Sequence, residues 1–257
     1  MVGLAWHVTG VSLQGTSHRK TGEGCQDVCD WRELPGGILA AAVADGAGSA
    51  RLAGEGALAA VTAVIAAADH PSLGVDPSDE ELRQVLDHLL ESALQAVEAQ
   101  AAAHSAVPRD LACTLIVVLA APQWVACAQI GDGAAVIGDG RSMVRLLTAP
   151  RSGEYLNETT FVVSPGAIAG AQRVIERGDM PRVAILSDGL QHLSLKMPSP
   201  AAPEWGAHPP FFLRLFDFVA RTPDAKTRQG EIERLLDSPR VRGRSDDDLT
   251  LFLAARS

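Results

Sequence analysis

Ile38-Leu39-Ala40-Ala41-Ala42-Val43-Ala44-Asp45-Gly46-Ala47-Gly48 is an apolar run that stops at an acid and a glycine-rich turn. The run is short enough to form one buried strand, and the Asp-Gly pair indicates a sharp turn at its end. A carboxylate at a strand end is held by a rigid element and still reaches solvent. The segment therefore predicts a buried strand that presents the side chain of Asp45 at one rim of a sheet.

Three further aspartates stand beside apolar runs in the same way. Asp132 and Asp188 each follow such a run and precede a glycine, and Asp247 lies in the segment Ser245-Asp246-Asp247-Asp248 directly before the apolar run 249–253. A single Asp-Gly pair at a strand end is most often only a turn. Turn chemistry does not explain why the acids repeatedly adjoin apolar strands, whereas Mg²⁺ and Mn²⁺ prefer carboxylate, carbonyl and water oxygens. The set therefore predicts a site for divalent cations, and its oxygen ligands do not distinguish Mn²⁺ from Mg²⁺.

The rest of the chain predicts a mixture of strands and helices. Strands are expected at 4–13, 38–44, 114–120, 124–130, 134–137, 143–147, 161–163, 183–186 and 249–254. Helices are expected at 54–68, from the capping box Ser78-Asp79-Glu80-Glu81 to about Ala103, at 211–220 and at 231–236. This order favours an α+β sandwich with antiparallel strands and helices layered outside them. The proline-rich segment 197–210 predicts an irregular surface excursion.

The bulk composition excludes several classes of protein. The chain has 257 residues, 47% of them apolar, which suffices for one large domain or two small ones. Its 22 basic and 31 acidic residues give a net charge of −9, which disfavours binding to nucleic acid. It contains no uninterrupted apolar stretch of the length a membrane span needs, and its first ten residues lack the pattern of a signal peptide.

The cysteines predict a reduced protein rather than a disulfide or zinc scaffold. Cys25 and Cys29 are separated by three residues, which is not the usual Cys-x-x-Cys spacing of zinc and redox sites. Cys113 and Cys127 lie inside apolar runs and are expected to be buried as small hydrophobic residues. A cytoplasmic location is the simplest expectation.

The acidic segments resemble the signature blocks of a known family. The blocks are Cys25-Gln26-Asp27, Val43-Ala44-Asp45-Gly46-Ala47-Gly48, Cys113-Thr114-Leu115, Ile130-Gly131-Asp132-Gly133, Leu186-Ser187-Asp188-Gly189-Leu190 and Asp247-Asp248-Leu249-Thr250. In this order, from about Val11 to Ala254, they resemble the PPM family of metal-dependent serine/threonine protein phosphatases, also called type 2C, and most closely its compact bacterial members. The resemblance implies a single PPM-type domain over residues 1–257, folded as a four-layer α-β-β-α sandwich with two central antiparallel sheets.

The resemblance also implies a mechanism and a role for each acid. Hydrolysis would use a water that bridges two Mn²⁺ or Mg²⁺ ions, without a phospho-enzyme. Asp45 would bridge both ions, and the carbonyl of Gly46, Asp188 and Asp247 would complete the ligand set. Asp27 would act through water bound to the metal. Asp132 would serve a third, weaker metal, as in bacterial members.

The sequence departs from the family pattern near the expected phosphate and at the third metal. Many members carry a phosphate-binding arginine a few residues before the early aspartate. Here that stretch is 17–24, in which His18 or Arg19 can substitute, and the residues do not choose between them. Four residues after Asp188, where some members place another acid, this chain has His192. Oxygen-rich sites prefer carboxylates, so a third metal is expected to bind weakly or not at all.

Three functions remain open at this point. The first is an active phosphatase that acts on phosphoserine or phosphothreonine of a protein substrate, with a cognate serine/threonine kinase as a further partner. The second is a non-catalytic module of the same fold that binds a phosphoprotein or a kinase, which the altered phosphate-binding stretch and His192 motivate. The third is hydrolysis of a small phosphoester. The complete set Asp45, Asp188 and Asp247 favours the first.

Overall fold

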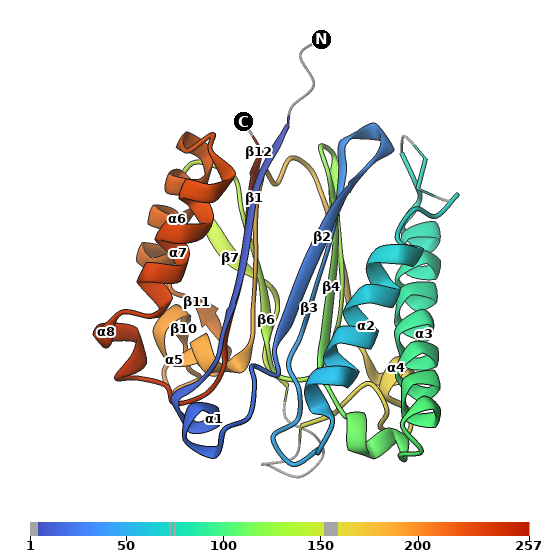
Figure 1. Cartoon of the computed structure of the whole chain (residues 1–257). Helices are drawn as coiled ribbons and strands as arrows, with labels where there is room; N and C mark the ends of the chain where they lie inside the picture. Colours follow the sequence, from blue (N-terminus) through green and yellow to red (C-terminus); the bar gives the residue numbers. More distant parts are fainter. Residues whose placement is uncertain (1–4, 72, 75, 152–158, 257) are drawn as a thin grey trace.

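Two antiparallel sheets of five strands each are stacked face to face, and helices cover the outer face of both (Figure 1). The computed structural model describes residues 5–71, 73–74, 76–151 and 159–256. Its layers run helix, sheet, sheet, helix. This arrangement confirms the expected four-layer α-β-β-α sandwich.

The two sheets draw their strands from both halves of the chain. The first sheet has the order β1 (Trp6–Leu13), β12 (Leu249–Arg256), β9 (Arg182–Leu186), β6 (Ala134–Gly138) and β7 (Val144–Thr148). The second has the order β2 (Val28–Leu34), β3 (Ile38–Ala44), β4 (Leu115–Ala121), β5 (Trp124–Ile130) and β8 (Gln172–Arg177). The short strands β10 (Leu195–Lys196) and β11 (Gly206–Ala207) form a separate pair.

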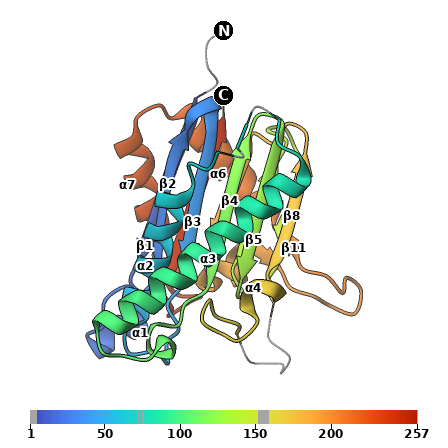
Figure 2. The ribbon, with the colours of Figure 1, turned by 90° about the vertical axis from the view of Figure 1, so that its right-hand side faces the viewer.

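Each sheet has its own pair of covering helices. α2 (Ala53–Ala67) and α3 (Asp79–Ala103) cross the outer face of the second sheet, with the short α4 (Ala167–Gly170) beside them (Figure 2). α6 (Pro209–Arg221) and α7 (Ala225–Leu236) lie on the first sheet (Figure 1). The remaining short helices are α1 (Thr16–Thr21), α5 (Gln191–Ser194) and α8 (Pro239–Arg242). None of the helices in the described ranges combines the length and the apolarity that a bilayer span requires.

Local sequence signals account for α3 and β3. The capping box at the start of α3 is formed, because Glu81 N donates to Ser78 Oγ at 3.2 Å and Ser78 N donates to the Glu81 carboxylate at 2.8 Å. Every residue of β3 is buried. Ala40 and its alternate neighbours face the helices, whereas Leu39 and its neighbours face the other sheet. Burial on both faces explains why β3 is a continuous apolar run rather than an alternating one.

The structure differs from the expected elements in several places. The prediction of a strand at 161–163 is wrong, because these residues lie in a turn. The turn is attached to the segment before β4, where Val162 N donates to Cys113 O at 2.9 Å. The strands β2 and β8 were not expected. Both are edge strands rich in charged residues, so neither carries the apolar run that signals a buried strand.

Candidate active site

Asp45 lies where β3 ends at the lower rim of the second sheet in Figure 1. Its backbone is held by Thr114, which accepts from Asp45 N through Oγ1 at 3.1 Å and donates from its own N to Asp45 O at 2.8 Å. A Cβ atom at Gly46 would lie 2.8 Å from the Cβ of Ala53 and 2.9 Å from the Cβ of Gln26, so the packing requires glycine there. The Asp-Gly pair is therefore a close-packed corner that aims the carboxylate of Asp45 out of the sheet end.

Two carboxylates from other elements meet that of Asp45. Asp188 follows β9 of the first sheet, and Asp27 precedes β2 of the second. The carboxyl groups of Asp27 and Asp188 both interact with that of Asp45. Asp188 also senses the charges of Asp132 and Asp247. The structure thus brings the five aspartates singled out in the sequence to one rim, where the ends of both sheets converge.

Burial and mutual repulsion disfavour the charged forms of these carboxyls. Burial raises the pKa of Asp27 to about 7 against the opposing hydrogen bond from Ser187. Burial, together with the charge of Asp132, raises the pKa of Asp188 to about 6. Burial and the neighbouring Asp27 and Asp188 raise the pKa of Asp45 well above its usual range. The cluster carries more negative charge than its surroundings compensate, as expected for residues that bind protons or cations.

The oxygen chemistry of the cluster fits divalent cations. Asp27 Oδ1 and Asp188 Oδ1 are buried and have no hydrogen-bond partner among the described residues. Buried carboxylate oxygens without a partner are unfavourable unless a cation or water approaches them. In the described ranges, however, no group of three or more His, Cys, Asp or Glu side chains lies close enough together to hold a metal ion. The carboxylate oxygens therefore suit a metal by their chemical type and their burial, but they are not yet positioned as a complete coordination shell.

A buried hydroxyl orients Asp27. Ser187 Oγ donates to Asp27 Oδ2 at 2.8 Å and accepts from Thr250 N at 3.0 Å. Sequence reasoning did not assign a role to Ser187 or Thr250, although both lie inside the quoted blocks. The signal was their position, directly before Asp188 and at the start of the last strand.

Asp132 is held at the edge of the cluster by polar side chains. Thr159 Oγ1 donates to Asp132 Oδ2 at 2.7 Å, and Gln191 Nε2 donates to Asp132 O at 2.6 Å. His192, next to Gln191 on α5, is exposed and makes no hydrogen bond or ion pair with the described residues. Gln191 is the contact that sequence reasoning missed.

The three aspartates at 246–248 differ in their exposure to solvent. Asp246 and Asp247 are exposed, whereas the side chain of Asp248 is 3% exposed. Asp248 Oδ1 accepts from Gly15 N at 2.5 Å, and its Oδ2 accepts from Gln26 N at 2.6 Å. Asp248 is thus a structural acid that sequence reasoning missed, because a run of three aspartates usually indicates a solvated loop.

His18 and Arg19 face different ways. His18 Nδ1 lies 3.0 Å from Asp248 Oδ1, and its side chain is 14% exposed. Burial opposes protonation of His18, but the carboxylates of Asp248, Asp247 and Glu23 together outweigh this effect, and the pKa of His18 is raised. Arg19 NH2 lies 3.4 Å from Asp237 Oδ1, with half of its side chain exposed. Of the two residues that the sequence left open, His18 is the one that adjoins the acidic cluster.

Comparison with known proteins agrees with this geometry. The chain matches the family model described as protein phosphatase 2C over residues 14–237. It is 34% identical to serine/threonine-protein phosphatase 3 of Escherichia coli (strain K12), with 98% of each chain covered. The family match spans the segments that carry Asp27, Asp45, Asp132 and Asp188 and ends before Asp247, whereas the Escherichia coli relative aligns with 98% of the chain.

Solved structures share the fold. The serine/threonine phosphatase Stp1 from Staphylococcus aureus has a TM-score of 0.69 at 14% identity, covering 99% of this chain and 97% of that one. The catalytic domain of the serine/threonine protein phosphatase PstP, solved with two manganese ions, has a TM-score of 0.60 at 18% identity, covering 98% of this chain and 99% of that one. Together with the family match and the Escherichia coli relative, they show that this chain belongs to the protein phosphatase 2C family and is a serine/threonine protein phosphatase.

Proposed function

We propose that this single-domain phosphatase hydrolyses phosphoserine and phosphothreonine in proteins with the help of two Mn²⁺ or Mg²⁺ ions. The observation that carries the proposal is the meeting of Asp27, Asp45 and Asp188 at one rim, with their pKa values raised by burial. The manganese ions bound by the related PstP domain support it. A cognate serine/threonine kinase would supply the phosphorylated substrates.

The proposed ligands are Asp45, the carbonyl of Gly46, Asp188 and Asp247. When bound, the cations lower the pKa of the attacking water and neutralise charge on the phosphoryl oxygens. Asp45 and Asp188 come from different sheets, so the packing of the two sheets sets the distance between their carboxylates. Oxygen donors on rigid strand ends are suited to holding ions in fixed places.

Asp27 acts on water rather than on substrate in this proposal. Ser187 occupies its Oδ2, which leaves the buried Oδ1 as the acceptor directed into the site. A carboxyl with a pKa of about 7 can accept a proton near neutral pH. Asp27 therefore orients a water molecule and can hold the proton that it releases.

His18 is proposed as the cation that meets the substrate phosphate. It stands beside the acidic cluster with a raised pKa, whereas Arg19 pairs with Asp237. Asp132 is proposed to serve a third, weaker metal. Its Oδ2 already accepts from Thr159, and His192 does not provide an additional carboxylate, so this third site should have the lowest affinity.

The test is hydrolysis of a phosphothreonine peptide with and without Mn²⁺, in the wild type, in Asp45→Ala and in Asp30→Ala. Asp30 is an exposed acid on β2, so its variant removes the same charge from the same sheet away from the rim. We expect Mn²⁺-dependent turnover in the wild type and in Asp30→Ala, and none above background in Asp45→Ala. Full activity of Asp45→Ala would refute the proposed ligand set.

A further inference from the structure

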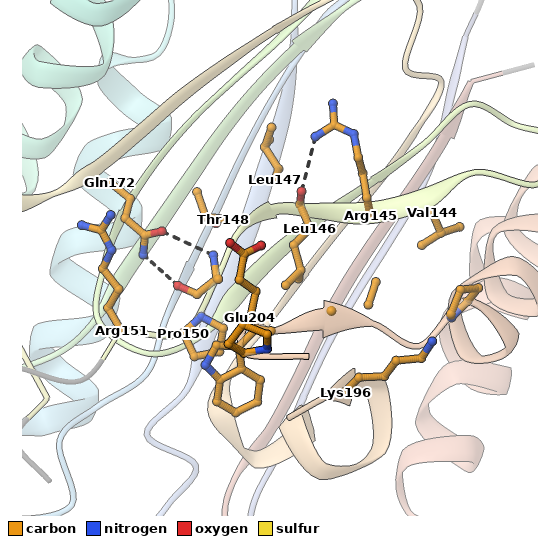
Figure 3. A pocket seen from close by; sticks show the side chains of 16 residues that line it. Val144, Arg145, Leu146, Leu147, Thr148, Pro150, Arg151, Gln172, Lys196 and Glu204 are labelled. Atoms are coloured by element: carbon orange, nitrogen blue, oxygen red, sulfur yellow. Dashed lines mark hydrogen bonds between the residues drawn. The ribbon is translucent and has the colours of Figure 1, made fainter. Parts of the chain in front are cut away.

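A groove lies beside β7 at the far edge of the first sheet (Figure 3). It encloses a cavity of about 770 Å³ between β7 and the β10–β11 pair. Its walls include Val144, Leu146, Arg151, Lys196 and Trp205. None of these residues belongs to the acidic rim, so the groove is a separate feature of the surface.

The wall formed by β7 is an unpaired strand edge. β7 is the last strand of its sheet and pairs only with β6 in the described ranges. Asp139 N donates to Met143 O at the turn between the two strands. Hydrogen bonding alternates along an antiparallel pair, so the backbone N–H and C=O groups of Val144 and Leu146 point away from β6, and the C=O of Leu146 accepts a long hydrogen bond from the Arg145 guanidinium at 3.5 Å. Such an edge can pair with an added extended chain.

The groove offers free positive charge on an acidic protein. Arg151 and Lys196 are exposed and make no ion pair with the described residues, whereas Arg145 is paired with Glu176 at 2.5 Å. In Figure 3, Arg151 and Lys196 lie on opposite sides of Glu204, the one acid among the described residues of the lining. The net charge of the chain is −9, so an acidic peptide is repelled by most of the surface and attracted here.

A hydrogen-bond network connects the groove to the acidic rim. Gln129 Nε2 donates to Ala149 O at 3.2 Å, just after β7, and to Gly133 O at 2.8 Å. Gly133 follows Asp132 directly, so the end of β7 and the Asp132 turn are held by one side chain. A chain paired with β7 would therefore continue toward the catalytic cluster.

We propose that this groove binds an extended, acidic segment of the phosphoprotein substrate next to the phosphorylated residue, by adding a strand to the free edge of β7. The inference rests on the proposed phosphatase function and extends it to substrate selection. The strand edge supplies affinity that does not depend on sequence, and Arg151 and Lys196 supply the preference for acidic side chains.

Reversing the charge of Lys196 or Arg151 tests the proposed preference of the groove for acidic peptides. The variants are Lys196→Glu and Arg151→Glu, with Lys226→Glu as the matched control on α7, which packs against β1 at the opposite end of the sheet from β7. The substrates are a phosphothreonine peptide with acidic residues on both sides and a small aryl phosphate. Each groove reversal should raise KM for the peptide roughly fivefold and leave aryl phosphate hydrolysis unchanged. Lys226→Glu should change neither.

Peptides with methylated backbone nitrogens test the strand pairing. Only every second N–H of an added strand faces β7, so methylation of one alternating set should raise KM while methylation of the other should not. Equal effects of both sets, or none, would overturn the strand-addition mode.

Other outcomes separate the groove from the catalytic proposal. A wild type that hydrolyses neither the phosphothreonine peptide nor the aryl phosphate would contradict the proposed function. Binding of a fluorescent acidic peptide, compared between wild type and Lys196→Glu, would still test the groove. If the reversals instead shift an equilibrium between monomer and dimer and leave peptide KM and binding unchanged, the groove joins copies of this chain and the proposal is wrong.

Discussion

Asp248 and His18 link two distant segments at the acidic rim, with His18 Nδ1 lying 3.0 Å from Asp248 Oδ1. Asp248 also accepts from Gly15 N and Gln26 N. One buried carboxylate therefore ties the segment before Asp27 to the segment that contains Asp247. The relative position of these two acids, which come from opposite ends of the chain, depends on this tie.

Replacing Asp248 should destabilise the fold at the acidic rim. Asp248→Ala leaves Gly15 N and Gln26 N without their acceptor and His18 without its ion-pair partner, and we expect it to lower the free energy of unfolding by about 3 kcal/mol. Asp246→Ala, which removes an exposed acid from the same triplet, should change it by less than about 0.5 kcal/mol. Urea unfolding in EDTA measures both. Equal stability of the two variants would show that the tie does not stabilise the fold.

The metal-free protein should lose stability as the pH rises toward neutrality. The folded state keeps protons on Asp27 and Asp188 up to pKa values of about 7 and about 6, whereas the unfolded chain releases them near pH 4. Between these limits the folded state binds more protons, so the free energy of unfolding falls with pH, by up to about 1.4 kcal/mol per unit for each excess proton. The contribution is complete below about pH 4 and lost above about pH 7.

Thermal unfolding in EDTA from pH 4.5 to 7.5 measures this slope. Asp27→Asn should flatten it, since asparagine does not titrate. Mn²⁺ should also flatten it, because cations replace the protons that the cluster would otherwise hold. A stability of the EDTA-treated wild type that is constant or rises over this range contradicts the raised pKa values.

The sequence predicted the parts of the molecule whose physics is local. Fully buried strands such as β3 are recognisable in the sequence as apolar runs. The turn after Asp45 needs glycine at position 46 because Ala53 and Gln26 pack against it. Edge strands such as β2 face solvent on one side and carry no such run. β2 pairs with the adjacent β3 and β8 pairs with the more distant β5, but neither edge strand carries in its own residues the apolar run that would have revealed it.

The candidate site likewise has residues that could be predicted from the sequence and residues that could not. Asp45, Asp132, Asp188 and Asp247 were predictable because each one adjoins an apolar strand, whereas Asp27 was named only through the family resemblance. The burial of Asp248 depends on Gly15 and Gln26, more than two hundred residues away along the chain. The choice between His18 and Arg19 likewise depends on where Asp248 and Asp237 lie after folding. Contacts of this kind leave no local signal.

Asp45→Asn should separate stability from activity. Asparagine keeps the shape of the side chain and removes a buried carboxyl whose charged form is disfavoured, so the EDTA-treated variant should unfold at the same temperature as the wild type or a few degrees above it, ~3 °C. Mn²⁺-dependent turnover should be lost, and Mn²⁺ should no longer raise the unfolding temperature. Scanning calorimetry with and without Mn²⁺ measures both effects. A variant that unfolds well below the wild type in EDTA would mean that Asp45 is needed for folding rather than for the cation.

Substitution of His18 and of Arg19 tests which cation meets the phosphate. His18→Gln removes the positive charge beside the rim, and we expect KM for a phosphothreonine peptide to rise roughly tenfold, the value of one charged hydrogen bond. Arg19→Gln should change KM by less than about twofold, because an exposed ion pair such as that with Asp237 contributes little. Inhibition by inorganic phosphate provides the second readout, since it reports phosphate affinity without the rest of the substrate. A larger effect of Arg19→Gln on both measurements would reassign the phosphate contact to Arg19 and require α1 to turn when substrate binds.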